Sequence, residues 1–154
     1  MANLCENVLR VSGYHDDLVR FGEAFRAGKE DREEYYHFDN LYPTPELSIC
    51  DRVDWRKEHW GINGNFYEES FLRDVICEGD MEVYYYFDTP WVAPERLIEF
   101  VSKNYPELNF LLIFYIDGSG GINEYSGGDL ISEEHLSYDD RKYWFGDDEI
   151  LEGA

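Results

Sequence analysis

Residues 81–88 read MEVYYYFD, and this stretch is the clearest strand signal in the chain. It is rich in β-branched and aromatic residues and follows a Gly-Asp turn signal, so we predict a strand. A second stretch of this kind, LNFLLIFYI at residues 108–116, is almost continuously apolar. Such a run is typical of a strand that is buried on both faces of a sheet.

The residues between these two strands predict a helix. Pro94 suits a first helical turn, and Leu97, Ile98 and Val101 form an apolar stripe at helical spacing. Pro106 ends the pattern just before the next strand. The helix is therefore expected to cover one face of the sheet.

The amino-terminal half indicates the same kind of unit. Residues 5–11 alternate as a strand does, residues 16–27 carry apolar side chains at helical spacing, and residues 55–67 predict a strand with a bulge near Gly61 and Gly64. The order strand, helix, strand, strand, helix, strand is that of a ferredoxin-like βαββαβ fold. We expect an α+β protein with a four-stranded antiparallel sheet and two helices on one face.

The carboxyl-terminal segment differs from the rest in charge. We divide the chain into a ferredoxin-like domain at residues 1–116 and an acidic, aromatic-containing extension at residues 117–154, packed on the same domain. The extension begins with GSGGINEYSGG, which we interpret as a turn, and it carries a net charge of −9 in 38 residues. Its apolar side chains predict that several residues dock on the body.

The whole chain is strongly acidic, with 34 Asp and Glu against 13 Lys and Arg and a formal charge of −21. Such a charge repels nucleic acids and anionic membranes and attracts basic proteins. A solubilising role for the charge is the alternative. The sequence therefore predicts a basic protein partner, such as a nucleic-acid-binding defence protein, and no direct contact with nucleic acid or membrane.

Nothing in the sequence suggests export, a membrane span or disulfides. No apolar run approaches the roughly 20 residues that cross a bilayer, and the first residues lack a signal-peptide layout. Cys5, Cys50 and Cys77 are widely spaced, so we expect reduced and mostly buried thiols. We predict a location in the bacterial cytoplasm; the oligomeric state stays open.

The search for catalytic and metal-binding motifs yields no strong candidate. The four histidines are scattered without HExxH spacing, and the glycine-rich run lacks the Lys-Ser/Thr of a phosphate-binding loop. The Asp139-Asp140 and Asp147–Glu149 runs lack the spacing of a calcium loop. We therefore predict a protein that is not an enzyme and holds no metal or cofactor; Trp60 and Trp91 are expected to be structural.

Several short segments resemble a known family. CENVLRVSG at residues 5–13, LYPTPEL at 41–47, HWGINGN at 59–65 and YYFDTPWVAP at 85–94 are similar to the YubB-type ferredoxin-like family of phage and plasmid proteins. The resemblance covers about residues 3–116. It implies the fold and an origin in a mobile element, and mobile elements make acidic proteins that block host nucleases.

Our leading hypothesis is an inhibitor that imitates the phosphates of a nucleic acid and blocks a CRISPR or restriction nuclease. Exposed ion pairs contribute only about 0–1 kcal/mol each, so aromatic anchors are expected among the acids. The predicted partner-binding residues are Asp129, Glu133, Glu134, Asp139, Asp140, Tyr143, Trp144, Asp147, Asp148 and Glu149.

The alternative hypothesis is a non-inhibitory structural or regulatory domain of a mobile element. In that case the partner contacts the aromatic face of the sheet, in which Tyr84, Tyr85 and Tyr86 follow one another, and the charge only keeps the protein soluble. The sequence names neither the target nor the role of the acidity, nor does it say whether the extension is ordered without a partner.

Overall fold

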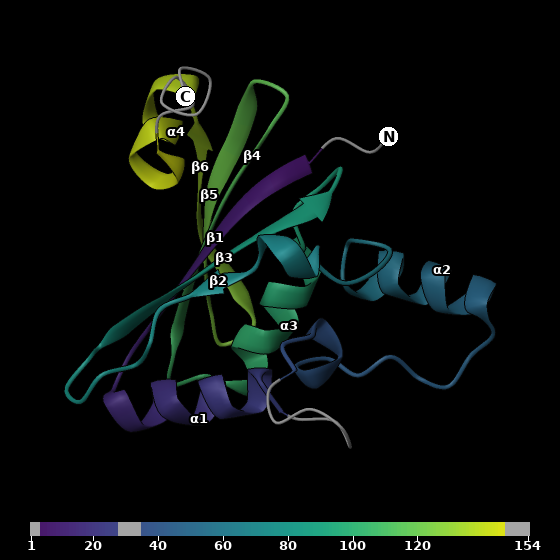
Figure 1. Ribbon diagram of the computed structural model, residues 1–154, viewed down its shortest axis with the longest axis horizontal. Coiled ribbons are helices and arrows are strands. Elements are labelled where there is room, and N and C mark those ends of the chain that lie inside the picture. Colours follow the sequence, from purple (N-terminus) through teal and green to yellow (C-terminus); the bar gives the residue numbers. More distant parts are fainter. Residues whose placement is uncertain (1–3, 28–34, 147–154) are drawn as a thin grey trace.

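The computed structural model describes residues 4–27 and 35–146 and builds them around one antiparallel sheet (Figure 1). The strand order is β2-β3-β1-β4-β5-β6, and every neighbouring pair is antiparallel. Its first four positions are the order of a ferredoxin-like sheet. The strands are β1 (Leu4–Ser12), β2 (Leu72–Arg73), β3 (Glu82–Pro90), β4 (Asn109–Ile116), β5 (Ser119–Ser126) and β6 (Asp129–Leu136).

Two helices cover one face of the sheet, as the sequence predicted. α1 (His15–Phe25) follows β1, and α3 (Glu95–Asn104) follows β3. Both bury their apolar stripes against the sheet, and this burial is why their apolar residues recur at helical spacing in the sequence. α4 (Tyr138–Phe145) lies on the opposite face, and α2 (Ile49–His59) projects to the side (Figure 1).

The main core lies between the sheet and the helices α1 and α3. Aromatic rings dominate it: Phe21 contacts Phe25 at a centroid distance of 6.0 Å and Phe110 at 5.4 Å. Trp60 is fully buried and donates its indole N–H to the carbonyl of Tyr42 at 3.1 Å. Trp60 is therefore structural, as expected.

The segment around residues 55–67 is not the strand that we expected. Residues 49–59 form α2, which Ser48 caps by accepting a hydrogen bond from the Asp51 amide at 3.2 Å. Gly61 has a φ of 84° just after the helix, a conformation that glycine adopts without strain. The edge strand β2 comes later in the chain and contains only two residues.

The sheet has six strands, so the expectation of four was wrong. Most of the glycine-rich run is the strand β5 and only its ends lie in turns, and residues that we assigned to an acidic extension continue the sheet as β6. Two hairpins make this possible, because Asp117-Gly118 and Gly127-Gly128 all have positive φ, as a tight two-residue turn requires. Residues 119–126 and 129–136 of the segment that we assigned to an acidic extension are therefore strands of the sheet itself.

Candidate partner-binding site

Among the described residues, β6 is the outermost strand of the sheet and pairs only with β5. All of its residues except Leu136 are exposed, and its acids are Asp129, Glu133 and Glu134. Charged side chains on an edge strand hinder pairing with another copy of the same strand. The predicted acids of this segment thus share one open edge.

The register of β6 decides where its carboxylates point. Glu134 lies opposite Ile122 and Glu133 lies opposite Asn123, so the two side chains project from opposite faces of the sheet. Asp129 begins the strand at the hairpin turn, opposite Ser126. The acids therefore flank the edge on both sides and do not form one cluster.

The short helix α4 continues directly from β6. Ser137 caps it by accepting a hydrogen bond from the Asp140 amide at 3.2 Å, and Asp139 and Asp140 lie exposed in its first turn. Acids at this position stabilise a helix through its dipole, so they have a local role besides any partner. We call residues 129–145 the β6–α4 surface.

The two predicted aromatic anchors differ in exposure. Tyr143 is 83% exposed, whereas Trp144 is half-buried and packs against the second core cluster, formed by Val8, Ile113, Tyr115 and Leu136. Tyr143 is thus available to a partner and Trp144 mainly holds α4 on the sheet. The remaining predicted residues, Asp147, Asp148 and Glu149, lie outside the described residues.

A buried arginine attaches α4 to the sheet. Arg141 is 4% exposed, and its Nε and Nη2 donate to Oε1 of Glu6 on β1 at 2.9 and 2.5 Å. Its guanidinium also lies 5.3 Å from the ring centroid of Tyr115 and 5.7 Å from that of Phe145. This contact positions Asp139, two residues earlier in α4, relative to β6.

The aromatic face of the alternative hypothesis is also present. Tyr84 and Tyr86 lie on the side of β3 that faces away from α1 and α3, with ring centroids 6.3 Å apart, while Tyr85 points into the main core. Both are half-buried, and Leu72 beside Tyr86 is 68% exposed. Part of this face is therefore left uncovered by α4.

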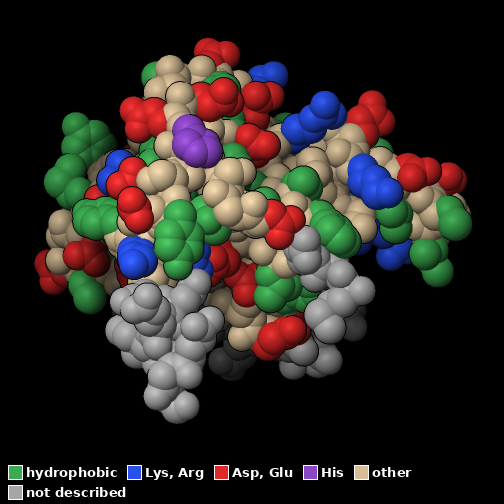
Figure 2. All heavy atoms as spheres, turned by 90° about the horizontal axis from the view of Figure 1, so that it is seen from above, with side chains coloured by type: hydrophobic (Ala, Val, Ile, Leu, Met, Phe, Trp, Pro, Cys, Tyr) green, Lys and Arg blue, Asp and Glu red, His purple; other side chains and the backbone are tan. Residues whose placement is uncertain are grey.

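Acidic side chains are not confined to the β6–α4 surface. On the face seen in Figure 2 they are spread over much of the molecule, among hydrophobic side chains and a few Lys and Arg. A partner that recognises one surface must therefore match the arrangement of its charges, because acidic side chains also occur elsewhere on the protein.

Asp88 shows how closely the acids lie. It is directly opposite Glu6 in the pairing of β1 with β3. Partial burial raises the pKa of the Asp88 carboxyl, and the charges of Glu6 and Glu69 raise it further. Ionising the Asp88 carboxyl therefore costs more free energy in the folded protein than in the unfolded chain.

Asp88→Asn should stabilise the protein at pH 7, by about 0.2–1 kcal/mol, the range for cross-strand pairs. A raised pKa means that the folded state takes up a proton more readily than the unfolded chain, so stability falls as pH rises through that pKa. The advantage of the amide should therefore shrink toward pH 4. Urea unfolding at both pH values, with the exposed Asp54→Asn as control, tests this; a destabilised Asp88→Asn protein at pH 7 would contradict it.

No group of three His, Cys, Asp or Glu side chains that could hold a metal ion occurs among residues 4–27 and 35–146.

Burial raises the pKa of the Cys5 thiol to about 12, so this thiol is a small apolar core group. Cys50 and Cys77 are free and exposed, against our expectation of mostly buried thiols. Within the same described part of the chain, no helix is long and apolar enough to cross a membrane.

Trp91 was assigned a structural role from the sequence, but it is 52% exposed. It has a φ of 68°, strained for a bulky residue, in a tight turn where the Val92 amide donates to the Pro90 carbonyl at 2.8 Å. Thr89 donates to the Val92 carbonyl at 2.7 Å and accepts from buried Asn7 at 3.0 Å. The Thr-Pro-Trp sequence marks the turn but does not show that the indole faces solvent.

Comparisons with known proteins agree on the fold. A family model described as "Ferredoxin-like domain in Api92-like protein" matches residues 67–153, from just before β2 to beyond α4. The crystal structure of the protein api92 from Yersinia pseudotuberculosis is similar with a TM-score of 0.59 and 9% identity, over 90% of this chain and 98% of that one. At this identity the similarity concerns the fold alone. No curated protein matches the sequence.

Proposed function

Because the chain belongs to the family of ferredoxin-like domains in Api92-like proteins, a family that gives the fold and no activity, we propose its function from its surface. We propose a non-catalytic acidic protein of phage or plasmid origin, of the YubB type, that acts in the bacterial cytoplasm. It binds a basic host defence nuclease through the β6–α4 surface and imitates nucleic-acid phosphates there.

The observation that carries this proposal is the open edge of β6. Seven consecutive residues, 129–135, are exposed, and three of them are acids on a rigid strand. Each residue of a strand rises about 3.3 Å, so β6 holds Asp129 at one end and Glu133 and Glu134 on its two faces near the other, without the entropy cost of ordering a tail. Tyr143 supplies an exposed aromatic ring on α4, the helix that follows β6.

The charges of β6 also restrict which partner can dock. A second copy of β6 would bring Glu133 and Glu134 against the same acids, which disfavours self-association. A groove lined with Lys and Arg would instead attract β6, because ion pairs form on both faces of the strand. A nuclease cleft that binds DNA phosphates has this character.

The test measures DNA cleavage by purified CRISPR effectors and restriction endonucleases with increasing amounts of the protein. We expect inhibition of at least one enzyme, with an affinity at least tenfold weaker at about 200 mM than at about 50 mM salt. A variant that neutralises the five described acids should bind that enzyme at least tenfold more weakly. It carries Asp129→Asn, Glu133→Gln, Glu134→Gln, Asp139→Asn and Asp140→Asn.

A matched control changes the net charge equally at exposed acids elsewhere. It should inhibit like the unmodified protein, because only the position of the charges differs; it carries Asp16→Asn, Asp51→Asn, Asp54→Asn, Glu58→Gln and Glu78→Gln. If both variants lose inhibition equally, inhibition depends on the net charge of the protein and not on the β6–α4 surface. If no enzyme of the set is inhibited, nuclease inhibition is wrong.

The alternative, a structural or regulatory domain, has its own support in the half-buried Tyr84 and Tyr86 rings and the exposed Leu72 beside them. Such a domain would lose its partner on Tyr84→Thr with Tyr86→Thr and would tolerate neutralisation of the β6–α4 acids. The two functions therefore predict opposite responses to the same pair of variants.

A further inference from the structure

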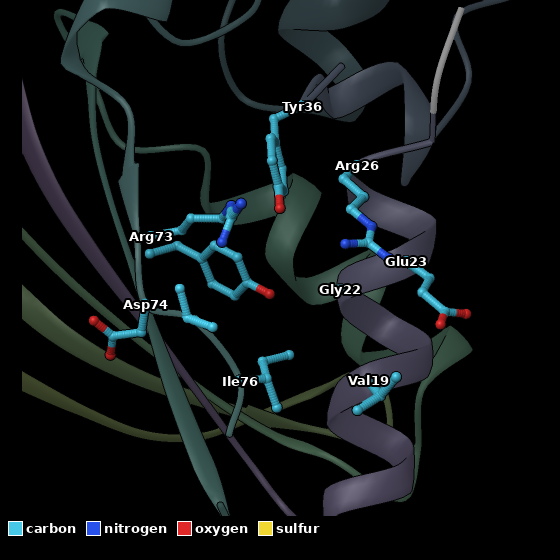
Figure 3. Close-up of a pocket in the computed structure, with 10 residues that line it drawn as sticks. Val19, Gly22, Glu23, Arg26, Tyr36, Arg73, Asp74 and Ile76 are labelled. Carbon is cyan, nitrogen blue, oxygen red and sulfur yellow. The ribbon is translucent and has the colours of Figure 1, made fainter. Parts of the chain in front are cut away.

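A cavity of about 320 Å³ lies between the carboxyl-terminal half of α1 and the edge strand β2 (Figure 3). It is far along the sheet from the β6–α4 surface, since β2 and β6 are the two opposite edges. Gly22 on α1 helps to form it, because a Cβ there would lie 3.2 Å from Cδ1 of Ile76 and 3.5 Å from the hydroxyl of Tyr85.

The polar side chains of the cavity are arranged by charge. Figure 3 shows the side chains of Arg26 and Arg73 turned toward the cavity, whereas the carboxylates of Glu23 and Asp74 point away from it. The Arg73 guanidinium lies 5.4 Å from the ring centroid of Tyr36, a cation–π contact that helps to hold it at the cavity. Two of the 13 basic residues of this acidic chain thus meet at one cavity.

Tyr85 adds a hydroxyl from the core side. Its ring is 2% exposed, and burial raises the pKa of the phenol well above its usual range, so the hydroxyl keeps its proton and can donate. The rest of the lining is apolar and comes from Val19, Val75 and Ile76. The cavity therefore combines cationic donors at one side with an apolar wall at the other.

From this arrangement we infer that the cavity binds a small organic anion, a carboxylate or phosphate monoester attached to an apolar body. The arginines bind the anionic group, because a guanidinium matches the oxygens of carboxylate and phosphate in pairs. The apolar body lies on Val19 and Ile76. The volume is at the lower end for small-molecule sites, so the ligand has about the size of a substituted benzene.

The test is an NMR titration of the full chain at about 0.15 M salt, where the Debye length of about 8 Å screens distant carboxylates. The probes are benzoate, phenyl phosphate, inorganic phosphate and benzyl alcohol. We expect saturable shifts of the Val19 and Ile76 methyl groups with the two aromatic anions, at millimolar affinity. Inorganic phosphate and neutral benzyl alcohol should bind at least tenfold more weakly.

Two variants separate the donors. Arg73→Gln should weaken binding of benzoate at least tenfold, because it removes the charged guanidinium, and Tyr85→Phe about fivefold, because it removes the hydroxyl donor and keeps the ring. Arg52→Gln, an exposed arginine on α2, should leave the affinity unchanged.

Three results would overturn the inference. They are the absence of saturable shifts with either aromatic anion at about 20 mM, equal binding of benzyl alcohol, and an Arg73→Gln variant that binds like the unmodified protein. Nuclease inhibition is measured separately and does not depend on this outcome.

Discussion

Gly120→Ala is expected to destabilise the protein by about 3 kcal/mol or more, at the upper end of the range for overpacked sites. A Cβ at this position would lie 1.9 Å from the carbonyl oxygen of Phe114 and 2.9 Å from Cα of Tyr115. Both are backbone atoms of β4, so no side-chain rotation relieves the clash. The two strands would have to separate where Gly120 pairs with Tyr115.

The measurement is thermal unfolding, in which about 3 kcal/mol corresponds to roughly 6–12 °C for a chain of this size. Gly64→Ala is the matched control, because its Cβ would have no atom within 4 Å. It should stay within about 0.5 kcal/mol of the unmodified protein. Equal melting temperatures for the two variants would show that β5 does not approach β4 as closely as described.

Gly120 matters beyond stability because β6 depends on β5. β6 has no other partner strand within residues 4–27 and 35–146, so any displacement of β5 moves Asp129, Glu133 and Glu134 with it. The proposed surface is therefore only as well defined as the hairpins that add the last two strands. The positions of its carboxylates therefore depend on uncharged glycines in β5 and in the two hairpin turns.

The sequence predicted the elements that bury one regular face. β1, β3 and β4 and the helices α1 and α3 all alternate or repeat with the period of their structure, because one side of each contacts the core. α2 was missed for the converse reason, since none of its residues is buried and no apolar stripe exists. Its cap at Ser48 and stop at Gly61 were the available signals.

The last two strands were missed although their turns were visible. Asp117-Gly118 and Gly127-Gly128 are strong signals for two-residue hairpins. β6, however, is exposed at nearly every position, so it lacks the alternation that identifies a half-buried strand, and the glycines of β5 suggested a loop. Turn chemistry should have outweighed periodicity here.

The candidate site was predictable in composition but not in geometry. The acids of residues 129–140 stand out by charge density alone. Nothing in the sequence pairs Arg141 with Glu6, which lies 135 positions earlier, because that contact exists only once β1 has joined the sheet. The same holds for the meeting of Arg26 and Arg73 at the other edge.

Arg141→Ala should destabilise the protein by about 2–3 kcal/mol, since it removes two charge-assisted hydrogen bonds to Glu6 and leaves that carboxylate only partly hydrated. Arg141→Met keeps most of the packing against Tyr115 and should therefore cost less than alanine. Urea unfolding of Glu6→Gln, Arg141→Met and the double variant gives the coupling energy, which should exceed 0.5 kcal/mol. The exposed Lys142→Ala is the control on the same helix.

The Arg141 variant also tests whether α4 belongs to the binding surface. If α4 leaves the sheet, Asp139, Asp140 and Tyr143 lose their fixed positions relative to β6, although no acidic group has been removed and the net charge becomes more negative. A partner that only senses charge would bind Arg141→Ala at least as well as the unmodified protein. A partner that needs β6 and α4 in register would bind it more weakly, and Lys142→Ala, with the same change in charge, would bind normally.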